Sequence, residues 1–284
     1  MSRAAWLNAA LAVIVLALGS YFYFRPARDA APEYPLSALT ARDARSVTIE
    51  RAGTAPVVLE KRQDGWFLTA PLAARADEAR MQQVLAIVEA RSAHRLPARE
   101  RRQFGLEPPQ ARVIVDGQVF GFGLVNETTR EQYVMAGDAV FAVHPGYGSA
   151  LPARPTDAAS RQLLDSREVP ARIESRQFVL AEQNGRWTLA PGGRDLSQDD
   201  LIRWVEEWRF AAALRVTPRS AAPARDEIRI GLKNGGAFTV GVLAREPELV
   251  LARSDEKLQY HFRAELAQRL LSPPAVRDEP AAKK

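Results

Sequence analysis

The chain has 284 residues, of which 46% are apolar, so it is long enough to bury about two domain-sized hydrophobic cores. Its 39 basic and 34 acidic residues give a net charge of only +5, and without a recognisable binding motif this excess predicts no nucleic-acid partner. The absence of cysteine excludes disulfides, thiol nucleophiles, cysteine-ligated zinc and lipid attachment through cysteine.

An uncharged apolar run, Ala4 to Phe24, opens the chain. A helix of roughly 20 apolar residues can span a bilayer, so the run predicts a transmembrane helix. The alternative is a cleaved signal peptide, with Ala17-Leu18-Gly19 as its cleavage site. We favour the uncleaved anchor, because the aromatic residues from Tyr21 to Phe24 are typical of a membrane interface.

The charges beside this run do not determine its orientation, because Arg3 precedes it while Arg25 and Arg28 follow it. The short region before the run resembles an export signal. We therefore expect a single-pass protein of the inner membrane, with its C-terminal body in the periplasm or otherwise outside the cytoplasm.

Two stretches of the same design follow, 120 positions apart. The stretch from Asp64 to Pro71 is a turn dipeptide, a short apolar strand and a proline, and the stretch from Asn184 to Pro191 repeats that order. Asp77 and Ser197 are the expected N-caps of the helices that come next. The apolar stripes of these helices match position by position: Met81, Val84, Leu85 and Val88, then Leu201, Trp204, Val205 and Trp208.

Alternating strands and hairpins continue from Val113 to Val143 in the first copy and from Ile228 to Phe262 in the second. Gly123 recurs as Gly241, and glycine inside a strand is typical of a bend or bulge. The predicted fold class is α+β, with an N-terminal transmembrane helix and two duplicated modules, each a mainly antiparallel sheet with one amphipathic helix packed on it. The predicted boundaries are 1–34 for the membrane anchor and connector, 35–155 and 156–272 for the repeats, and 273–284 for a disordered tail.

The densest basic segment runs from Arg91 to Arg102 and contains five arginines, with Glu100 as its one acidic residue. A patch for phosphate or lipid head groups is one interpretation. We favour a solvated helix end followed by a loop, since arginine is favourable at helix C-termini and Pro97 marks the stop.

The order of several short motifs resembles the domain-of-unknown-function 4340 family of bacterial proteins. The motifs are Gly65-Trp66 with Leu68 and Pro71, Phe104-Gly105-Leu106 with Pro109, Gly123, and the hairpin from Tyr133 to Val143. The resemblance covers roughly Ser46 to Phe262, although Ala222-Pro223-Ala224 replaces the Gly-Leu element in the second copy. It implies an envelope protein tethered by an N-terminal span or lipid, sometimes associated with ABC-type export or gliding-motility systems, and it implies no catalytic residues.

Reactive side chains do not gather in the sequence. His94, His144 and His261 lie far apart and none is at metal-ligand spacing. Neighbouring carboxylates on a helix point to different sides, which separates each of the pairs Asp77-Glu78, Asp199-Asp200 and Glu206-Glu207. We therefore predict no catalytic residues, no metal site, no cofactor and no evident small-molecule substrate.

The prediction for function is a non-catalytic binding or scaffold module for an inner-membrane protein complex, such as an ABC-type export system. The alternative is an envelope hydrolase or a glycan-binding protein. Four tryptophans could stack on sugar rings, but their positions on matched apolar stripes favour the core: Trp66, Trp187, Trp204 and Trp208.

Overall fold

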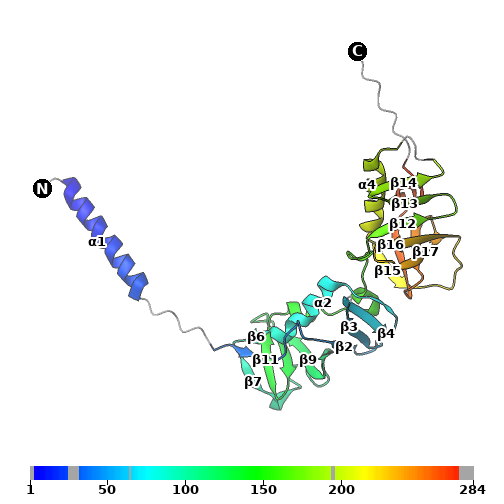
Figure 1. Cartoon of the computed structure of the whole chain (residues 1–284). Coiled ribbons are helices and arrows are strands. Elements are labelled where there is room, and N and C mark those ends of the chain that lie inside the picture. Colours follow the sequence, from blue (N-terminus) through cyan, green and yellow to red (C-terminus); the bar gives the residue numbers. More distant parts are fainter. Residues whose placement is uncertain (1–2, 25–31, 64, 193–195, 275–284) are drawn as a thin grey trace.

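The computed structural model describes residues 3–24, 32–63, 65–192 and 196–274. Helix α1 (Arg3–Phe24) comes first, and three antiparallel sheets of nine, eight and two strands follow it (Figure 1). Most of the predicted connector and nearly all of the predicted tail, residues 25–31 and 275–284, lie outside the described residues.

The first sheet has nine strands in the order β5-β4-β3-β2-β8-β9-β10-β11-β7. Most neighbours are joined by short turns, such as the Asp116-Gly117 turn between β8 and β9, where both residues have positive φ. Its strands are β2 (Ser46–Arg51), β3 (Val57–Arg62), β4 (Gly65–Ala70), β5 (Ala74–Arg75), β7 (Arg95–Pro97), β8 (Ala111–Val115), β9 (Gln118–Val125), β10 (Gln132–Ala136) and β11 (Ala139–Val143).

The second sheet has eight strands in the order β14-β13-β12-β16-β17-β18-β19-β15. The first sheet without its edge strand β5 has the same spatial strand order as the second sheet. Its β4 corresponds to β14 at one edge, and its β7 corresponds to β15 at the other. Its strands are β12 (Pro170–Glu174), β13 (Val179–Gln183), β14 (Arg186–Ala190), β15 (Arg215–Pro218), β16 (Asp226–Leu232), β17 (Ala237–Ala244), β18 (Glu248–Arg253) and β19 (Leu258–Arg263).

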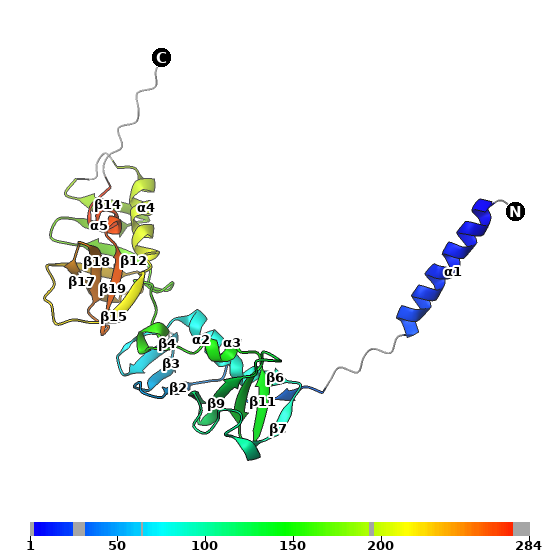
Figure 2. The same cartoon turned by 180° about the vertical axis from the view of Figure 1, so that it is seen from behind.

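One amphipathic helix packs on each large sheet, and both helices begin where the sequence predicts. The Asp77 carboxylate accepts a hydrogen bond from Arg80 N, and Ser197 forms a reciprocal capping box with Asp200. Figure 2 shows α5 on the second sheet, where it contacts β18 and β19. The remaining elements are α2 (Glu78–Leu85), η1 (Ala86–Glu89), η2 (Ala98–Glu100), α3 (Gly146–Ser149), η3 (Pro155–Ala158), α4 (Gln198–Arg209), α5 (Glu265–Leu271), and the two-stranded sheet of β1 (Tyr34–Pro35) and β6 (Arg91–Ser92).

Each large sheet covers its own hydrophobic core. The first core lies between the first sheet and α2, with Met81 and Val84 of the helix fully buried against strand residues. The second lies under α4 and α5 and contains Trp208. Ala74 comes from β5 of the first sheet but packs in the second core, and Leu72 contacts both. The segment after β4 therefore joins the two halves of the molecule.

The predicted irregularity at Gly123 is confirmed as a β-bulge. The register between β9 and β10 shifts where Gln132 pairs with Val125 and Val134 pairs with Phe122. A Cβ atom on Gly123 would lie 2.1 Å from the carbonyl oxygen of Phe104. The same backbone approach forms a hydrogen bond of 2.9 Å from Leu124 N to Phe104 O, so only glycine fits at this position.

The predicted fold class, α+β with a transmembrane helix, is wrong in two respects. The folded part of the chain is mainly β-structure, because long meanders of strands dominate it and α2 and α4 have only eight and twelve residues. A helix needs about 20 predominantly apolar residues to span a bilayer. Among the residues that the structure describes, no helix is long and apolar enough to cross a membrane.

Candidate functional site

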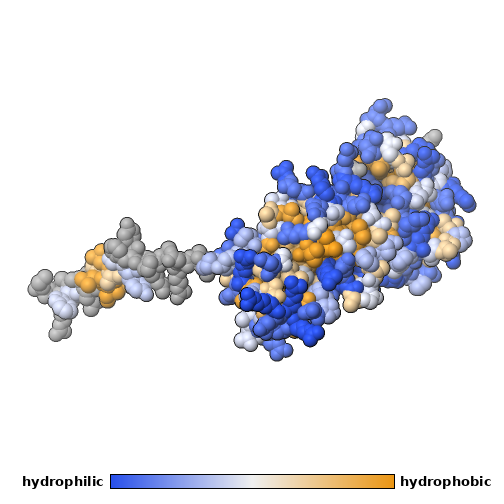
Figure 3. All heavy atoms as spheres, turned by 90° about the horizontal axis from the view of Figure 1, so that it is seen from below, coloured by the Kyte–Doolittle hydropathy of each residue, from blue (hydrophilic) through white to orange (hydrophobic). Residues whose placement is uncertain are grey.

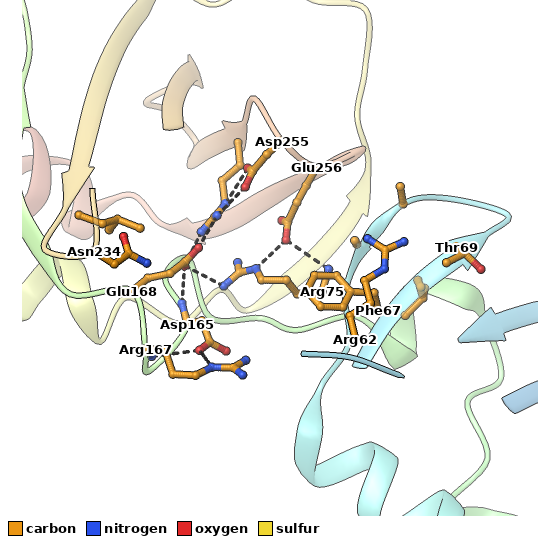
Figure 4. Close-up of a pocket in the computed structure, with 15 residues that line it drawn as sticks. Arg62, Phe67, Thr69, Arg75, Asp165, Arg167, Glu168, Asn234, Asp255 and Glu256 are labelled. Carbon is orange, nitrogen blue, oxygen red and sulfur yellow. Dashed lines mark hydrogen bonds and ion pairs between the residues drawn. The ribbon is translucent and has the colours of Figure 1, made fainter. Parts of the chain in front are cut away.

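A cavity of about 440 Å³ lies where the two halves of the chain meet (Figure 4). Strands β4 and β5 line it on the side of the first sheet. The linker that leads into β12 and the turn between β18 and β19 line the other side. Charged side chains from these segments form the most extensive ion-pair network among the described residues, and the hydroxyl of Tyr260 on β19 bonds to it. We call this group the interface cluster: Arg75, Glu168, Arg253, Asp255, Glu256 and Tyr260.

Backbone hydrogen bonds to the second half of the chain fix the segment that carries Arg75. Arg75 pairs with Phe67 in the first sheet, while its carbonyl oxygen accepts from Ser160 N at 2.9 Å. On either side, Lys257 N donates to Ala73 O at 3.0 Å and Asp77 N donates to Ala158 O at 2.9 Å. The position of the Arg75 side chain is therefore set by the backbone.

The guanidinium group of Arg75 is enclosed by acceptors. Its Nε donates to Glu256 Oε1 at 2.7 Å and its Nη1 to Glu168 Oε2 at 3.2 Å. Its Nη2 lies 2.9 Å from the carbonyl oxygen of Gln162 and 3.1 Å from that of Leu163. Burial is the largest influence and opposes the charge, but the attractions of Glu256, Tyr260 and Glu168 together outweigh it and raise the pKa of Arg75. Arg75 therefore links the first sheet to the second through permanent charge.

Arg253 is 1% exposed and lies at the centre of the interface cluster. It forms a bidentate ion pair with Glu168 and another with Asp255, with N···O distances between 2.7 and 3.0 Å. Its guanidinium carbon also lies 3.7 Å from the ring centroid of Phe238. Burial opposes the charge of Arg253, yet the hydrogen bonds that it donates to Glu168 and Asp255 raise its pKa. With a fifth hydrogen bond, from Nη1 to the carbonyl oxygen of Leu163 at 2.7 Å, the Arg253 side chain has no donor left for a ligand.

Tyr260 and Glu256 complete the interface cluster. Glu256 accepts from Arg75 on one oxygen and from the Tyr260 hydroxyl on the other. Burial of the Tyr260 ring, followed by the nearby charge of Glu256, raises the pKa of the phenol. Burial works against Asp255, but its hydrogen bonds from Arg253 lower the pKa of that carboxyl. The interface cluster therefore joins two arginines, three carboxylates and a phenol in direct contact, which suits a structural lock.

Five of the six carboxylates in the adjacent pairs have a structural partner: Asp77, Glu78, Asp200, Glu206 and Glu207. Asp77 caps α2, and Glu78 accepts a hydrogen bond from Trp66 N at 3.0 Å. Glu206 pairs with Arg209, and Glu207 pairs with Arg269 of α5. Asp200 caps α4 together with Ser197.

The three histidines have separate environments and do not contact one another in the described structure. His94 is exposed, and His144 accepts a hydrogen bond from Gly146 N at 3.0 Å. His261 is buried, with Nδ1 2.9 Å from Glu248 and Nε2 2.9 Å from the Thr217 hydroxyl. No group of three or more histidine, aspartate or glutamate side chains that could hold a metal ion occurs within the described ranges.

The four tryptophans are core residues, as the matched stripes predict. Their exposed fractions run from 0% for Trp208 to 8% for Trp187, with Trp66 and Trp204 between these values. Trp204 Nε1 donates to the carbonyl oxygen of Arg269 at 2.9 Å, which ties α4 to α5. A stacking platform for sugar rings would require open faces, so these residues do not support glycan binding.

Sequence reasoning missed every member of the interface cluster, although two signals were present. Arg75 corresponds to Asp195 at the offset of 120, so the two copies carry opposite charges at one position. Arg253 continues the inward alternation of Leu249 and Leu251 along β18, which marks a charge at a core position. Neither signal identifies the acidic partners, because Glu168 and Glu256 lie in connecting segments.

A family model described as Domain of unknown function (DUF4340) matches residues 66–218, which is more than half of the chain. The match therefore shows the family whose motifs the sequence resembles. No curated protein and no solved structure matches the chain.

Proposed function

This chain belongs to the family described as Domain of unknown function (DUF4340), and that description assigns no role. From the geometry of the chain itself, we propose that it is a non-catalytic binding or scaffold module for a membrane protein complex. The interface cluster carries this proposal. Its three carboxylates are all engaged by Arg75 or Arg253, and all five N–H donors of Arg253 have acceptors in turn. Charges that neutralise one another serve to hold two sheets in one orientation, and they leave no free acid or base for catalysis.

The outer face of the first sheet supports a binding role. Val58, Thr48, Ile114 and Val119 are cross-strand neighbours on this face, and none of them is buried. Val119 is 41% exposed. Figure 3 shows hydrophobic residues gathered on the part of the body that the first sheet forms. The exposed Val119 and the half-buried Val58 and Ile114 thus lie on one face around Thr48, and apolar surface patches are a feature of protein interaction sites.

An envelope hydrolase and a glycan-binding protein are the alternatives. Several carboxylates line the interface cavity, and a hydrolase would need such groups beside a bound substrate. Their arginine partners argue against that role, since a catalytic acid needs a proton that it can exchange near neutral pH. The buried tryptophans argue against a glycan platform.

Site-specific photocrosslinking in cells tests the scaffold role. The crosslinker is placed at Val119 on the apolar face and, as a matched control, at Arg229, an exposed polar position on the second sheet. We expect crosslinks from Val119 to one integral-membrane complex, such as an ABC-type exporter, and none from Arg229. Crosslinks to glycan, or an equal background from both positions, would count against the proposal.

We also propose that the folded body lies outside the cytoplasm, next to the inner membrane. The export-like N-terminal region and the resemblance to envelope proteins support this location. Alkaline phosphatase fused after Lys284 should be active, and a reporter that works only in the cytoplasm should be inactive at the same position. The reverse pattern would place the body in the cytoplasm.

A further inference from the structure

The arginine-rich segment from Arg91 to Arg102 is not the helix end that the sequence suggests. Helix α2 ends at Leu85, and η1 ends at Glu89, before the first of these arginines. The segment instead forms β6, β7 and η2. Attraction to a helix C-terminus therefore does not explain why arginines accumulate here.

The segment holds most of the net charge of the protein. Five arginines and one glutamate give it +4, against +5 for the whole chain. All five arginines are exposed, and His94 is exposed among them. Within the described residues, Arg95 pairs with Asp138 at 3.3 Å, and the other four make no ion pair with a carboxylate: Arg91, Arg99, Arg101 and Arg102.

The backbone of the segment is firmly held. The buried Ser92 hydroxyl donates to the carbonyl oxygen of Ala142 at 2.6 Å, and β7 pairs with β11. After η2, the carbonyl oxygens of Arg101 and Arg102 accept from Leu106 N and Gly105 N. The arginines are thus displayed on a fixed surface, where each can meet a separate anionic group.

The position of this surface in the fold indicates what it meets. Strand β1 pairs with β6, so Pro35 lies opposite Arg91 at the point where the N-terminal part of the chain enters the body. Figures 1 and 2 show β6 at this end of the body, and Figure 3 shows strongly hydrophilic residues gathered there. Between Phe24, where α1 ends, and Tyr34, the chain can extend by at most about 36 Å.

Helix α1 precedes this surface in the chain. Its large apolar side chains are exposed, among them Trp6 at 75%, Ile14 at 58% and Leu16 at 70%. An apolar helix and an unneutralised basic surface therefore occur within a short reach of each other. A lipid bilayer offers complementary chemistry to both, hydrocarbon below a layer of phosphate groups.

We propose that the surface formed by residues 91–102 binds the head groups of anionic phospholipids. Guanidinium groups suit this role because each can donate two parallel hydrogen bonds to one phosphate. Binding here would orient the body with its N-terminal end against the lipid surface. The proposal requires no membrane-spanning helix, and it is independent of the scaffold role.

Vesicle binding by the full chain tests the proposal. The partition coefficient of the protein is measured on vesicles containing about one third phosphatidylglycerol and on vesicles of phosphatidylcholine alone, and the ratio of the two is compared between variants. Any binding through α1 that does not depend on head-group charge cancels in this ratio. The test variant replaces four arginines by glutamine: Arg91, Arg99, Arg101 and Arg102. The matched control makes the same change at four exposed arginines of the second half that form no ion pair in the described structure: Arg176, Arg186, Arg225 and Arg229.

We expect the ratio to fall about tenfold or more in the test variant and to change little in the control. Lysine at the same four positions should restore most of the preference, because it keeps the charge. Equal losses in the test and control variants would mean that only the net charge of the protein matters, which would contradict a specific surface at residues 91–102. An unchanged ratio in the test variant would also overturn the proposal. Inorganic phosphate is added as a competitor. Displacement at millimolar concentrations would identify a site for free phosphate in place of a lipid surface.

Discussion

Arg75 on β5 and Glu256 in the turn before β19 form an ion pair of 2.7 Å that joins the two halves of the chain. Both side chains are largely buried, with exposed fractions of 11% and 3%. Breaking a buried pair by removing one partner leaves the other charge without compensation. The Arg75→Ala variant should therefore lose about 3 to 5 kcal/mol of unfolding free energy, measured by urea denaturation.

The matched control for this prediction is Arg172→Ala. Arg172 pairs with Glu174 at 2.9 Å, but the two side chains are 48% and 42% exposed. Exposed pairs of this kind contribute under about 1 kcal/mol, so the denaturation midpoint should move little. If Arg75→Ala were no less stable than Arg172→Ala, the interface cluster would not be a lock.

The sequence predicts the local elements well because they depend on short-range physics. Turn glycines, the N-caps Asp77 and Ser197, and the apolar stripes of the two helices all lie where the structure has them. The balance of helix and strand is harder to predict, since short connecting strands such as β5 and β7 have no pattern of their own. Arg75 shows the larger difficulty: its role depends on Glu168 and Glu256, which are 93 and 181 positions away.

Trp208 offers a test of the second core. Its side chain is fully buried between α4 and the second sheet. Trp208→Ala should cost roughly 3 to 5 kcal/mol of stability, because the remaining side chains cannot fill the space. Phe210→Ala, at a position that is 69% exposed, is the control and should be nearly neutral. An unchanged melting temperature for Trp208→Ala would place that residue at the surface and revive the glycan-binding alternative.

Gly123 tests the bulge in β9. Alanine at this position would bring Cβ within 2.1 Å of the Phe104 carbonyl oxygen, so the backbone must move and the Leu124 to Phe104 hydrogen bond must weaken. We expect Gly123→Ala to lose about 1 to 3 kcal/mol of unfolding free energy. The control is Gly231→Ala in β16, where the nearest atom would be 3.5 Å away. Equal stability of the two variants would contradict the close approach.

Tyr260 should make the stability of the folded protein depend on pH in the alkaline range. Burial, followed by the charge of Glu256, raises the pKa of the phenol above its ordinary value of 10.0. The unfolded chain therefore releases the proton first as pH rises, so the stability contributed by Tyr260 is fully present below about pH 10 and is lost above it. Urea midpoints measured between pH 8 and about 11 should fall more steeply for the unmodified protein than for Tyr260→Phe.

The same series separates this effect from general alkaline denaturation. The two proteins differ only in the hydroxyl group of residue 260, so the difference between the two curves belongs to Tyr260. The control Tyr34→Phe, at a residue that is 37% exposed, should follow the unmodified protein across the whole range. If Tyr260→Phe also followed it, the phenol would ionise alike in the folded and unfolded chains, and its hydrogen bond to Glu256 would contribute nothing to the lock between the two sheets.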